Sequence, residues 1–257
     1  MPPSICLLTA YASNYSAFAA LSIPHMKAYA ACHEYDFRAI QTDDCDRAGG
    51  WIKIDSIRSA LSADYEFVFW MDVDALVVRK DIDIRTAVRP GADIHMTWHG
   101  RGPPQFGDPA HFNAGIMLIR CSQWSRRFFR RVWDAGPLPH KWNDQAAILH
   151  LLGYDDILHL GPSRPREPGR KCIATLDAAW NSIIGIEVAD DPIIHHYAGI
   201  ADYQVRLGLM KVDEATIERR AKGSAEFRRA FLRQLGEWRH ASVRVKLHRD
   251  TSSQGLT

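Results

Sequence analysis

The sequence predicts an α/β fold with a mixed, mostly parallel sheet flanked by helices. Two observations carry this prediction: strand-like and helix-like segments alternate through the first half of the chain, and one short apolar run ends abruptly in two carboxylates. Consecutive β-α-β units form parallel sheets with helices packed on their faces. The predicted strands are 5–9, 36–40 and 67–71, and the predicted helices are 15–33, with a break near Pro24, and 51–63.

The second half of the chain adds further predicted elements. Residues 94–98 and 112–120 are apolar enough to be core strands. Residues 122–134 have the four-residue apolar spacing of an amphipathic helix, and the arginines around that stripe form its solvated face. Residues 100–110 and 161–169 are rich in glycine, proline and arginine, so they are expected to be loops that close over a site.

Composition and charge limit the class of protein. With 46% hydrophobic and 24% charged residues, the chain is an ordinary soluble globular protein, and a net charge of +2 argues against a dedicated nucleic-acid binder. The charge is uneven, because residues 211–250 carry 11 Lys/Arg and 6 Asp/Glu, a net +5. We expect a main domain over 1–210 and a basic helical extension over 211–257. That extension could contact anionic membrane, although solubility is its simpler role.

The cysteines and the hydropathy pattern predict a cytoplasmic protein, and the basic extension allows a peripheral position at the inner face of a membrane. The five cysteines are odd in number and include no Cys-x-x-Cys spacing, which favours reduced thiols. The short apolar stretch at 5–12 resembles a first core strand instead of a signal peptide. No apolar run approaches the ~18 residues of a membrane span. The oligomeric state stays open.

Asp72 and Asp74 are the first candidates for a functional site. They follow the apolar run Phe67–Met71, and residues two apart in extended chain point to the same face. Two carboxylates held together repel one another unless a cation lies between them or one is protonated. A divalent metal solves this problem, because carboxylate oxygens suit Mg²⁺ and Mn²⁺, and such ions often hold substrate phosphates. A solvated turn is the alternative for so short a motif.

Four further segments follow in order: Phe112-Asn113-Ala114-Gly115, Trp142-Asn143-Asp144-Gln145, Ala179-Trp180-Asn181 and His196-Tyr197-Ala198-Gly199. Behind a strand that ends Trp-Met-Asp-Val-Asp, they resemble a GT-A glycosyltransferase with a DxD motif. The resemblance is closest to the galactosyl-, mannosyl- and xylosyltransferase family of yeast mannan and plant xyloglucan synthesis. It extends more distantly to glycogenin and the lipopolysaccharide galactosyltransferases. It covers roughly residues 5–199 and implies a Rossmann-like GT-A catalytic domain.

The resemblance implies a metal site made by Asp72, Asp74 and His196. Asp74 would bind the metal directly, and Asp72 would bind the metal, the ribose or both. His196 is preferred to His195 because it stands in the His-Tyr-x-Gly frame of the family, and the two side chains would point to opposite sides of a strand. An imidazole ligand favours Mn²⁺ over Mg²⁺, although Mg²⁺ stays possible.

The resemblance also implies residues for the nucleotide-sugar donor and for catalysis. Asn113 is expected to contact a sugar, and Asp144 and Gln145 to lie beneath the anomeric carbon, with a helix N-cap as the alternative role of Asp144. Lys211 is a weaker candidate for a phosphate contact. Tyr11 could instead serve in ordinary packing, and Lys53 and Arg58 could instead lie at a solvated helix edge. The expected donor-binding residues are Thr9, Ala10, Tyr11, Lys53, Arg58, Asp72, Gly115 and Gly199.

The predicted function is therefore a metal-dependent, retaining transfer of a hexose or pentose from a nucleotide-diphospho sugar to a glycan or glycolipid. UDP-galactose, UDP-glucose or UDP-xylose are favoured over GDP-mannose by resemblance alone. Two alternatives stay open. A phosphatase of the haloacid dehalogenase type also has an Asp-x-Asp after an apolar strand, and a protein on the same fold could bind sugar without catalysis.

Overall fold

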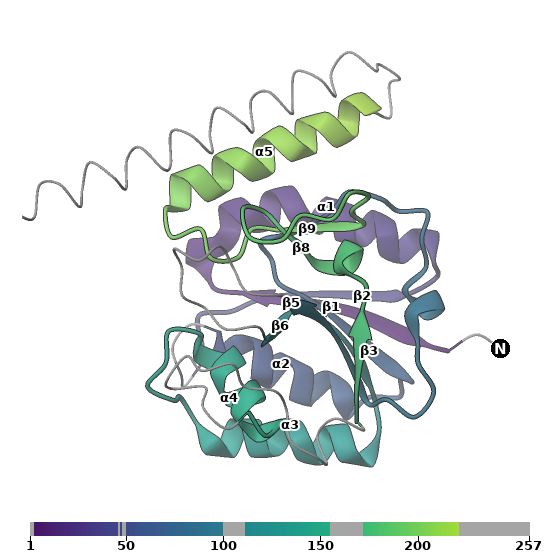
Figure 1. Cartoon of the computed structure of the whole chain (residues 1–257), viewed down its shortest axis with the longest axis vertical. Helices are drawn as coiled ribbons and strands as arrows, with labels where there is room; N and C mark the ends of the chain where they lie inside the picture. The colour runs from purple at the N-terminus through teal and green to yellow at the C-terminus, as the bar shows by residue number, and fades with distance from the viewer. Residues whose placement is uncertain (1–2, 46, 48–49, 100–110, 155–171, 221–257) are drawn as a thin grey trace, which may run out of the picture. The chain divides into compact units, whose positions relative to one another are not determined.

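The computed structural model has a central six-stranded mixed sheet, in the order β2-β1-β3-β6-β5-β7 (Figure 1). β1 pairs in parallel with β2 and β3, β6 runs antiparallel between β3 and β5, and β7 is parallel to β5. The prediction of a mixed, mostly parallel sheet is confirmed. The strands are β1 Ile5–Tyr11, β2 Asp36–Gln41, β3 Phe67–Met71, β5 Ile94–His99, β6 His111–Arg120 and β7 Ile173–Leu176.

The chain divides into two compact units, residues 1–207 and 208–257. No helix in the part of the chain that the structure describes is long and apolar enough to span a membrane. The predicted loops 100–110 and 161–169 lie outside that part, as does most of the predicted basic extension, so the domain boundary expected at 210/211 stays a prediction. The described residues are 3–45, 47, 50–99, 111–154 and 172–220.

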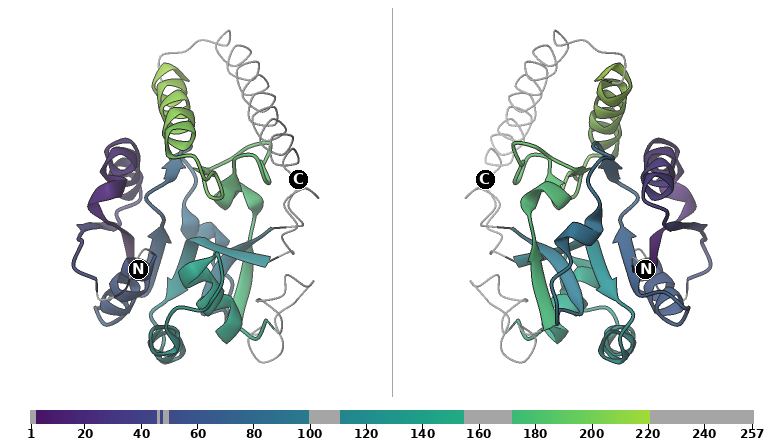
Figure 2. Two further views of the ribbon diagram at one scale, coloured as in Figure 1. Left: turned by 90° about the vertical axis from the view of Figure 1, so that its left-hand side faces the viewer. Right: turned by 90° about the vertical axis from the view of Figure 1, so that its right-hand side faces the viewer.

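Helices cover both faces of the sheet (Figure 1, Figure 2). α1 packs on one face, where Met26 and Tyr29 meet Phe69 of β3. α2, α3 and α4 pack on the other face, where Ile57 and Phe129 are fully buried. β3 therefore lies between two apolar layers, which explains why all five of its residues are apolar. The helices are α1 Ser16–Cys32, α2 Trp51–Leu61, α3 Gln123–Ala135, α4 Asn143–Leu151 and α5 Tyr203–Arg220.

A second, three-stranded sheet joins the end of β3 to a distant part of the chain. Its order is β4-β9-β8, formed by Ala75–Val77, Ile194–His196 and Ser182–Ile183. β4 begins directly after Asp74 and pairs antiparallel with β9, with Ala75 opposite His196. This register brings a histidine more than 120 positions away beside the two carboxylates.

A register shift in β5 and β6 leaves part of β6 without a partner on that side. Met96 pairs with Met117, but the next residue, Thr97, pairs with Asn113. Residues 114–116 of β6 are therefore unpaired with β5, and the N–H and C=O groups of Ala114 are available to side chains. Irregularities of this kind are common beside active sites.

Two predictions about helices were wrong. α1 runs without interruption through Pro24, because buried side chains on both sides of the proline, among them Phe18 and Tyr29, hold it against the sheet and compensate for one missing hydrogen bond. A basic helical extension was expected from residue 211, but α5 begins at Tyr203, where the Asp202 carboxylate accepts from the N–H groups of the first turn.

Replacement of Phe69 by alanine tests the two-layered packing around β3. The Phe69 side chain is fully buried, with its ring centroid 6.2 Å from that of Tyr29 and 6.4 Å from that of Trp180. We expect Phe69→Ala to lower the free energy of unfolding, measured with urea, by about 3–5 kcal/mol. Val188→Ala is the control, because Val188 is 45% exposed and its truncation should cost less than about 0.5 kcal/mol. Equal losses in the two variants would contradict the packing described.

Candidate metal centre and active site

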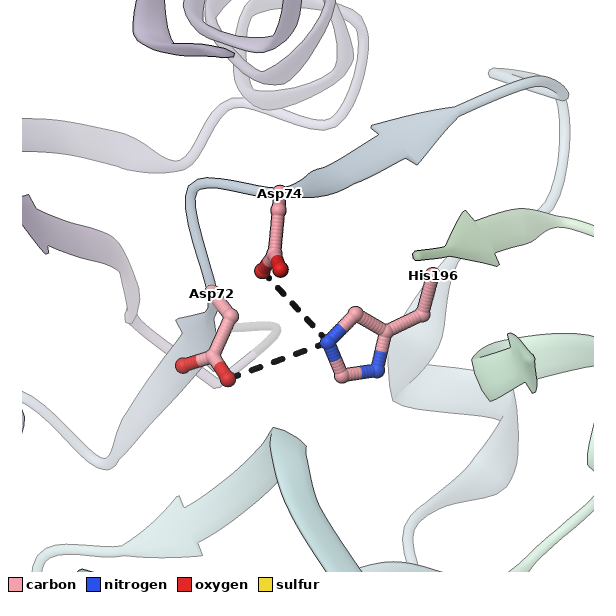
Figure 3. Close-up of side chains that lie close together, drawn as sticks. All are labelled: Asp72, Asp74 and His196. Carbon is pink, nitrogen blue, oxygen red and sulfur yellow. Dashed lines mark ion pairs between the residues drawn. The ribbon is translucent and has the colours of Figure 1, made fainter. Parts of the chain in front are cut away.

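Asp72, Asp74 and His196 lie together beyond the end of β3 (Figure 3). One ligand atom from each residue lies within 4.8 Å of those from the other two. The Nε2 atom of His196 is 3.5 Å from Oδ1 of Asp74 and 3.8 Å from Oδ2 of Asp72. Asp74 and His196 are buried, at 8% and 2% exposure, while Asp72 is partly open to solvent. The structure thus brings the three predicted metal ligands together.

A relay of hydrogen bonds fixes which nitrogen of His196 carries the proton. The backbone N–H of Gly115 donates to Oδ1 of Asn113 at 2.8 Å, so this atom is an acceptor. The Nδ2 group of Asn181 donates to the same oxygen at 3.0 Å, and Oδ1 of Asn181 therefore faces His196 Nδ1 at 2.9 Å. Nδ1 must donate to it. In the neutral ring, Nε2 then directs a lone pair at two carboxylates, an arrangement that suits a divalent cation between them.

Lys53 of α2 neutralises the other side of Asp72. Its buried Nζ lies 2.9 Å from Oδ1 of Asp72 and 3.0 Å from Oδ2 of Asp144, and it donates to the Ala114 carbonyl at 3.2 Å. Burial acts to lower the pKa of Lys53, but the two carboxylates outweigh it and raise that pKa, so the ammonium stays charged. Burial also raises the pKa of Asp144, and Lys53 offsets this only in part. The Trp70 indole N–H donates to Asp72 Oδ1 at 2.8 Å.

Arg206 donates a hydrogen bond to the second carboxylate oxygen of Asp74, the one that does not face His196. Its Nη1 donates to Asp74 Oδ2 at 2.8 Å, from the first turns of α5. Burial acts to raise the pKa of Asp74, but His196 and Arg206 outweigh it and lower that pKa to about 2. Asp74 is therefore ionised throughout the physiological range, as a metal ligand requires.

A cavity of about 220 Å³ opens beside these groups. The wall also contains an aromatic stack that the sequence prediction did not include, in which the His111 and Trp142 ring centroids are 4.1 Å apart. His99 is a further unpredicted wall residue: burial lowers its pKa to about 4, so its ring is neutral. The predicted site residues that line the cavity are Lys53, Asp72, Asn113, Gly115, Asp144, Gln145, His196 and Gly199.

Other predicted site residues do not line this cavity. Thr9, Ala10 and Tyr11 form the carboxyl end of β1, where Thr9 is fully buried and its hydroxyl has no hydrogen-bond partner among the described residues. The Arg58 guanidinium instead lies 3.3 Å from Asp55 and 4.9 Å from the ring centroid of Trp133. Lys211 belongs to the second unit. Donor contacts by these residues stay predictions.

The predicted catalytic side chains are held by the unpaired segment of β6 and by α2. Gln145 accepts from the Ala114 N–H through its amide oxygen, at 2.8 Å. Asp144 lies in the first turn of α4, whose N-cap is Trp142, so the alternative role of Asp144 as an N-cap is wrong. Its carboxylate lies against Gly50, where a Cβ atom would come within 1.9 Å of Asp144 Oδ1. The residue before α2 must therefore be small.

Asn181 and Arg206 are the functional candidates that sequence reasoning missed. Asn181 was noticed only as part of a segment, and nothing local indicates that it orients a histidine 15 positions later. Arg206 is one of many basic residues near the C-terminus. Asp202 determines where α5 begins, and this start of the helix directs the Arg206 side chain toward Asp74.

Gly115→Ala tests the close approach of β6 to His196. A Cβ atom there would lie 2.1 Å from Cε1 of His196 and 2.8 Å from both ring nitrogens, so the ring must move and its bond to Asn181 must break. We expect a crystal structure to show His196 displaced from Asp74, with an overpacking cost of about 1–3 kcal/mol in unfolding free energy. Gly91→Ala is the control, because its Cβ meets no atom within 4 Å and only its positive φ is strained. An unmoved ring in Gly115→Ala would refute this role.

Comparisons with known proteins give a family likeness for the first third of the chain. Residues 4–90, about a third of the chain, match the galactosyl transferase GMA12/MNN10 family. A probable glycosyltransferase 6 of Oryza sativa subsp. indica is 31% identical over 112 residues, covering 41% of this chain and 23% of the relative. An alpha-1,2-galactosyltransferase of Schizosaccharomyces pombe is 25% identical over 171 residues, covering 53% and 46%. The chain thus spans about a quarter of the first relative and less than half of the second.

Solved structures agree in fold. A glycosyltransferase involved in the glycosylation of the major capsid of PBCV-1 has a TM-score of 0.60 at 16% identity, covering 81% of this chain and 99% of that one. The glycosyltransferase GlyE of Streptococcus pneumoniae has a TM-score of 0.52 at 14% identity, covering 94% and 65%. The chain therefore has the GT-A fold of these glycosyltransferases, and its first third resembles the galactosyl transferase family.

Proposed function

We propose that the chain is a metal-dependent glycosyltransferase that transfers a sugar from a nucleotide-diphospho sugar to a glycan or glycolipid. The observation that carries this proposal is the convergence of Asp72, Asp74 and the Nε2 atom of His196 beside a cavity lined by further polar groups. The family match supports the same activity. UDP-galactose, UDP-glucose and UDP-xylose are the donors that we favour.

The charges of the site suit a diphosphate once a divalent ion is bound. Asp72, Asp74 and Asp144 carry −3, and Lys53 and Arg206 carry +2, so the cluster has a net charge of −1 before His196 is counted. A bound divalent ion, preferably Mn²⁺, would raise this to +1 and would stabilise the negative charge that develops on the leaving diphosphate. The cluster alone would repel the diphosphate, which is a reason to expect metal dependence.

The resemblance to the galactosyl-, mannosyl- and xylosyltransferase family implies a retaining reaction. Asp144 and Gln145 are held at the cavity wall by Lys53 and by the backbone of Ala114, where they could support a developing oxocarbenium ion. The bond between the anomeric carbon and the diphosphate oxygen breaks, and the acceptor oxygen forms its bond on the same face. The departing diphosphate takes the acceptor proton, so no separate general base is required.

Asp74→Asn tests metal dependence and activity together. With Mn²⁺ and each of the three UDP-sugars, we expect hydrolysis and transfer to fall at least about 100-fold relative to the wild type. Asp191→Asn removes the same charge from an exposed carboxylate paired with Arg79, so it should retain activity. GDP-mannose in place of the UDP-sugars tests the preference for these three donors.

Other outcomes of that experiment would favour the alternatives. Equal turnover by the wild type and Asp74→Asn would contradict the proposal. Phosphate release from sugar phosphates without any nucleotide sugar would support the phosphatase. Failure to bind UDP and Mn²⁺ would support a non-catalytic sugar-binding protein.

Asn181→Leu tests whether the relay behind His196 matters for the metal. The substitution removes the acceptor for Nδ1–H of His196 and the donor to Asn113, so the ring loses its fixed tautomer. Loss of such an outer contact costs about 10–100-fold in metal affinity, and calorimetric titration with Mn²⁺ should show a loss of that size. Asn181→Asp keeps an acceptor oxygen and should lose less. Wild-type affinity in Asn181→Leu would rule out the relay.

A further inference from the structure

Arg206 places a second cation on the carboxylate that would bind the metal. Its Nη1 donates to Oδ2 of Asp74, while Oδ1 of the same carboxylate faces His196 Nε2 at 3.5 Å. The side chains of Arg206 and Asp74 are 15% and 11% exposed, so water screens this ion pair weakly. One oxygen of Asp74 is thus directed at the metal site and the other at a fixed positive charge.

The position of Arg206 is built by its neighbours. The Arg206 N–H donates to the Asp202 carbonyl at 3.0 Å within the turn that starts α5. The guanidinium lies 4.8 Å from the ring centroid of Phe18 and 5.5 Å from that of Tyr15, distances at which an aromatic face attracts a cation. Its Nε is buried and has no hydrogen-bond partner in the part of the chain that the structure describes, so the aromatic rings and Asp74 hold the group. Burial of an arginine with an unsatisfied nitrogen is costly, which points to a use for its charge.

That charge opposes a metal ion. A divalent cation on Oδ1 of Asp74 and a guanidinium on Oδ2 are like charges that share one carboxylate in a buried site, and they repel. A diphosphate brought to the same place would attract both. The repulsion is therefore largest when the metal binds alone and is offset when the nucleotide binds with it.

We infer that Arg206 is an internal counter-ion that weakens metal binding in the free protein and makes metal and nucleoside diphosphate binding depend on one another. This inference rests on the proposed function and adds an order to it: the metal is held tightly only together with the nucleotide. Because such coupling is reciprocal, the metal strengthens UDP binding by the same factor by which UDP strengthens metal binding.

The test is a set of calorimetric titrations with Mn²⁺, without and with saturating UDP. Arg206→Gln removes the charge, Arg206→Lys keeps it, and Arg120→Gln is a matched control in which an arginine paired with Glu66 at a distant surface is neutralised. We expect Arg206→Gln to bind Mn²⁺ alone about tenfold more tightly than the wild type and to lose about tenfold of the strengthening caused by UDP. Arg206→Lys and Arg120→Gln should behave like the wild type. Thermal unfolding of each variant shows whether it is folded.

Weaker or unchanged binding of Mn²⁺ alone by folded Arg206→Gln would overturn the inference, because Arg206 would then only orient Asp74. An unchanged effect of UDP in that variant would overturn it too. If the wild type binds neither Mn²⁺ nor UDP, the proposed function itself fails. If it binds both and the variants do not differ, only the role of Arg206 fails.

Discussion

The repulsion between Asp72 and Asp74 is the constraint on which the rest of the site depends. The two carboxylates are held together because β3 is buried between two layers and β4 pairs with β9 directly after Asp74. Each carboxylate is stabilised by its own internal cation, Lys53 for Asp72 and Arg206 for Asp74. Such pairs stabilise a fold little, since their desolvation is costly, so their presence here is best explained by the charge that the site must handle.

The features that a short stretch of sequence determines were predictable. β3 and the carboxylates after it follow from an apolar run that stops at one position, and the choice of His196 over His195 agrees with the one that the structure directs at Asp74. Asn181 and Arg206 were not predictable in this way, because their roles depend on contacts between segments that are distant in the chain. Nothing in the residues around Arg206 indicates an aspartate 132 positions earlier.

Predictions from local sequence preferences were wrong where tertiary packing determined the course or the start of a helix. Pro24 favours a break in α1, but the helix is fastened to the sheet on both sides of the proline. Asn143 and Asp144 have the composition of an N-cap, yet Trp142 is the N-cap and α4 begins at Asn143, which has a φ of 47°. That start turns Asp144 toward Lys53 and away from the end of its own helix. In both places the tertiary contacts outweigh a preference of about 1–3 kcal/mol.

Because of the register shift, the geometry of the site depends on the number of residues in β6. Residues after the shift pack into both apolar layers, while Ala114 gives its backbone groups to Gln145 and Lys53. Because neighbouring side chains of a strand alternate between faces, the loss of one residue at 114–116 would exchange the faces on one side of the deletion. One deletion would then disrupt both the apolar packing of β6 and the contacts that Ala114 makes in the site. Homologous chains should therefore vary in length at almost any surface turn before they vary within this strand.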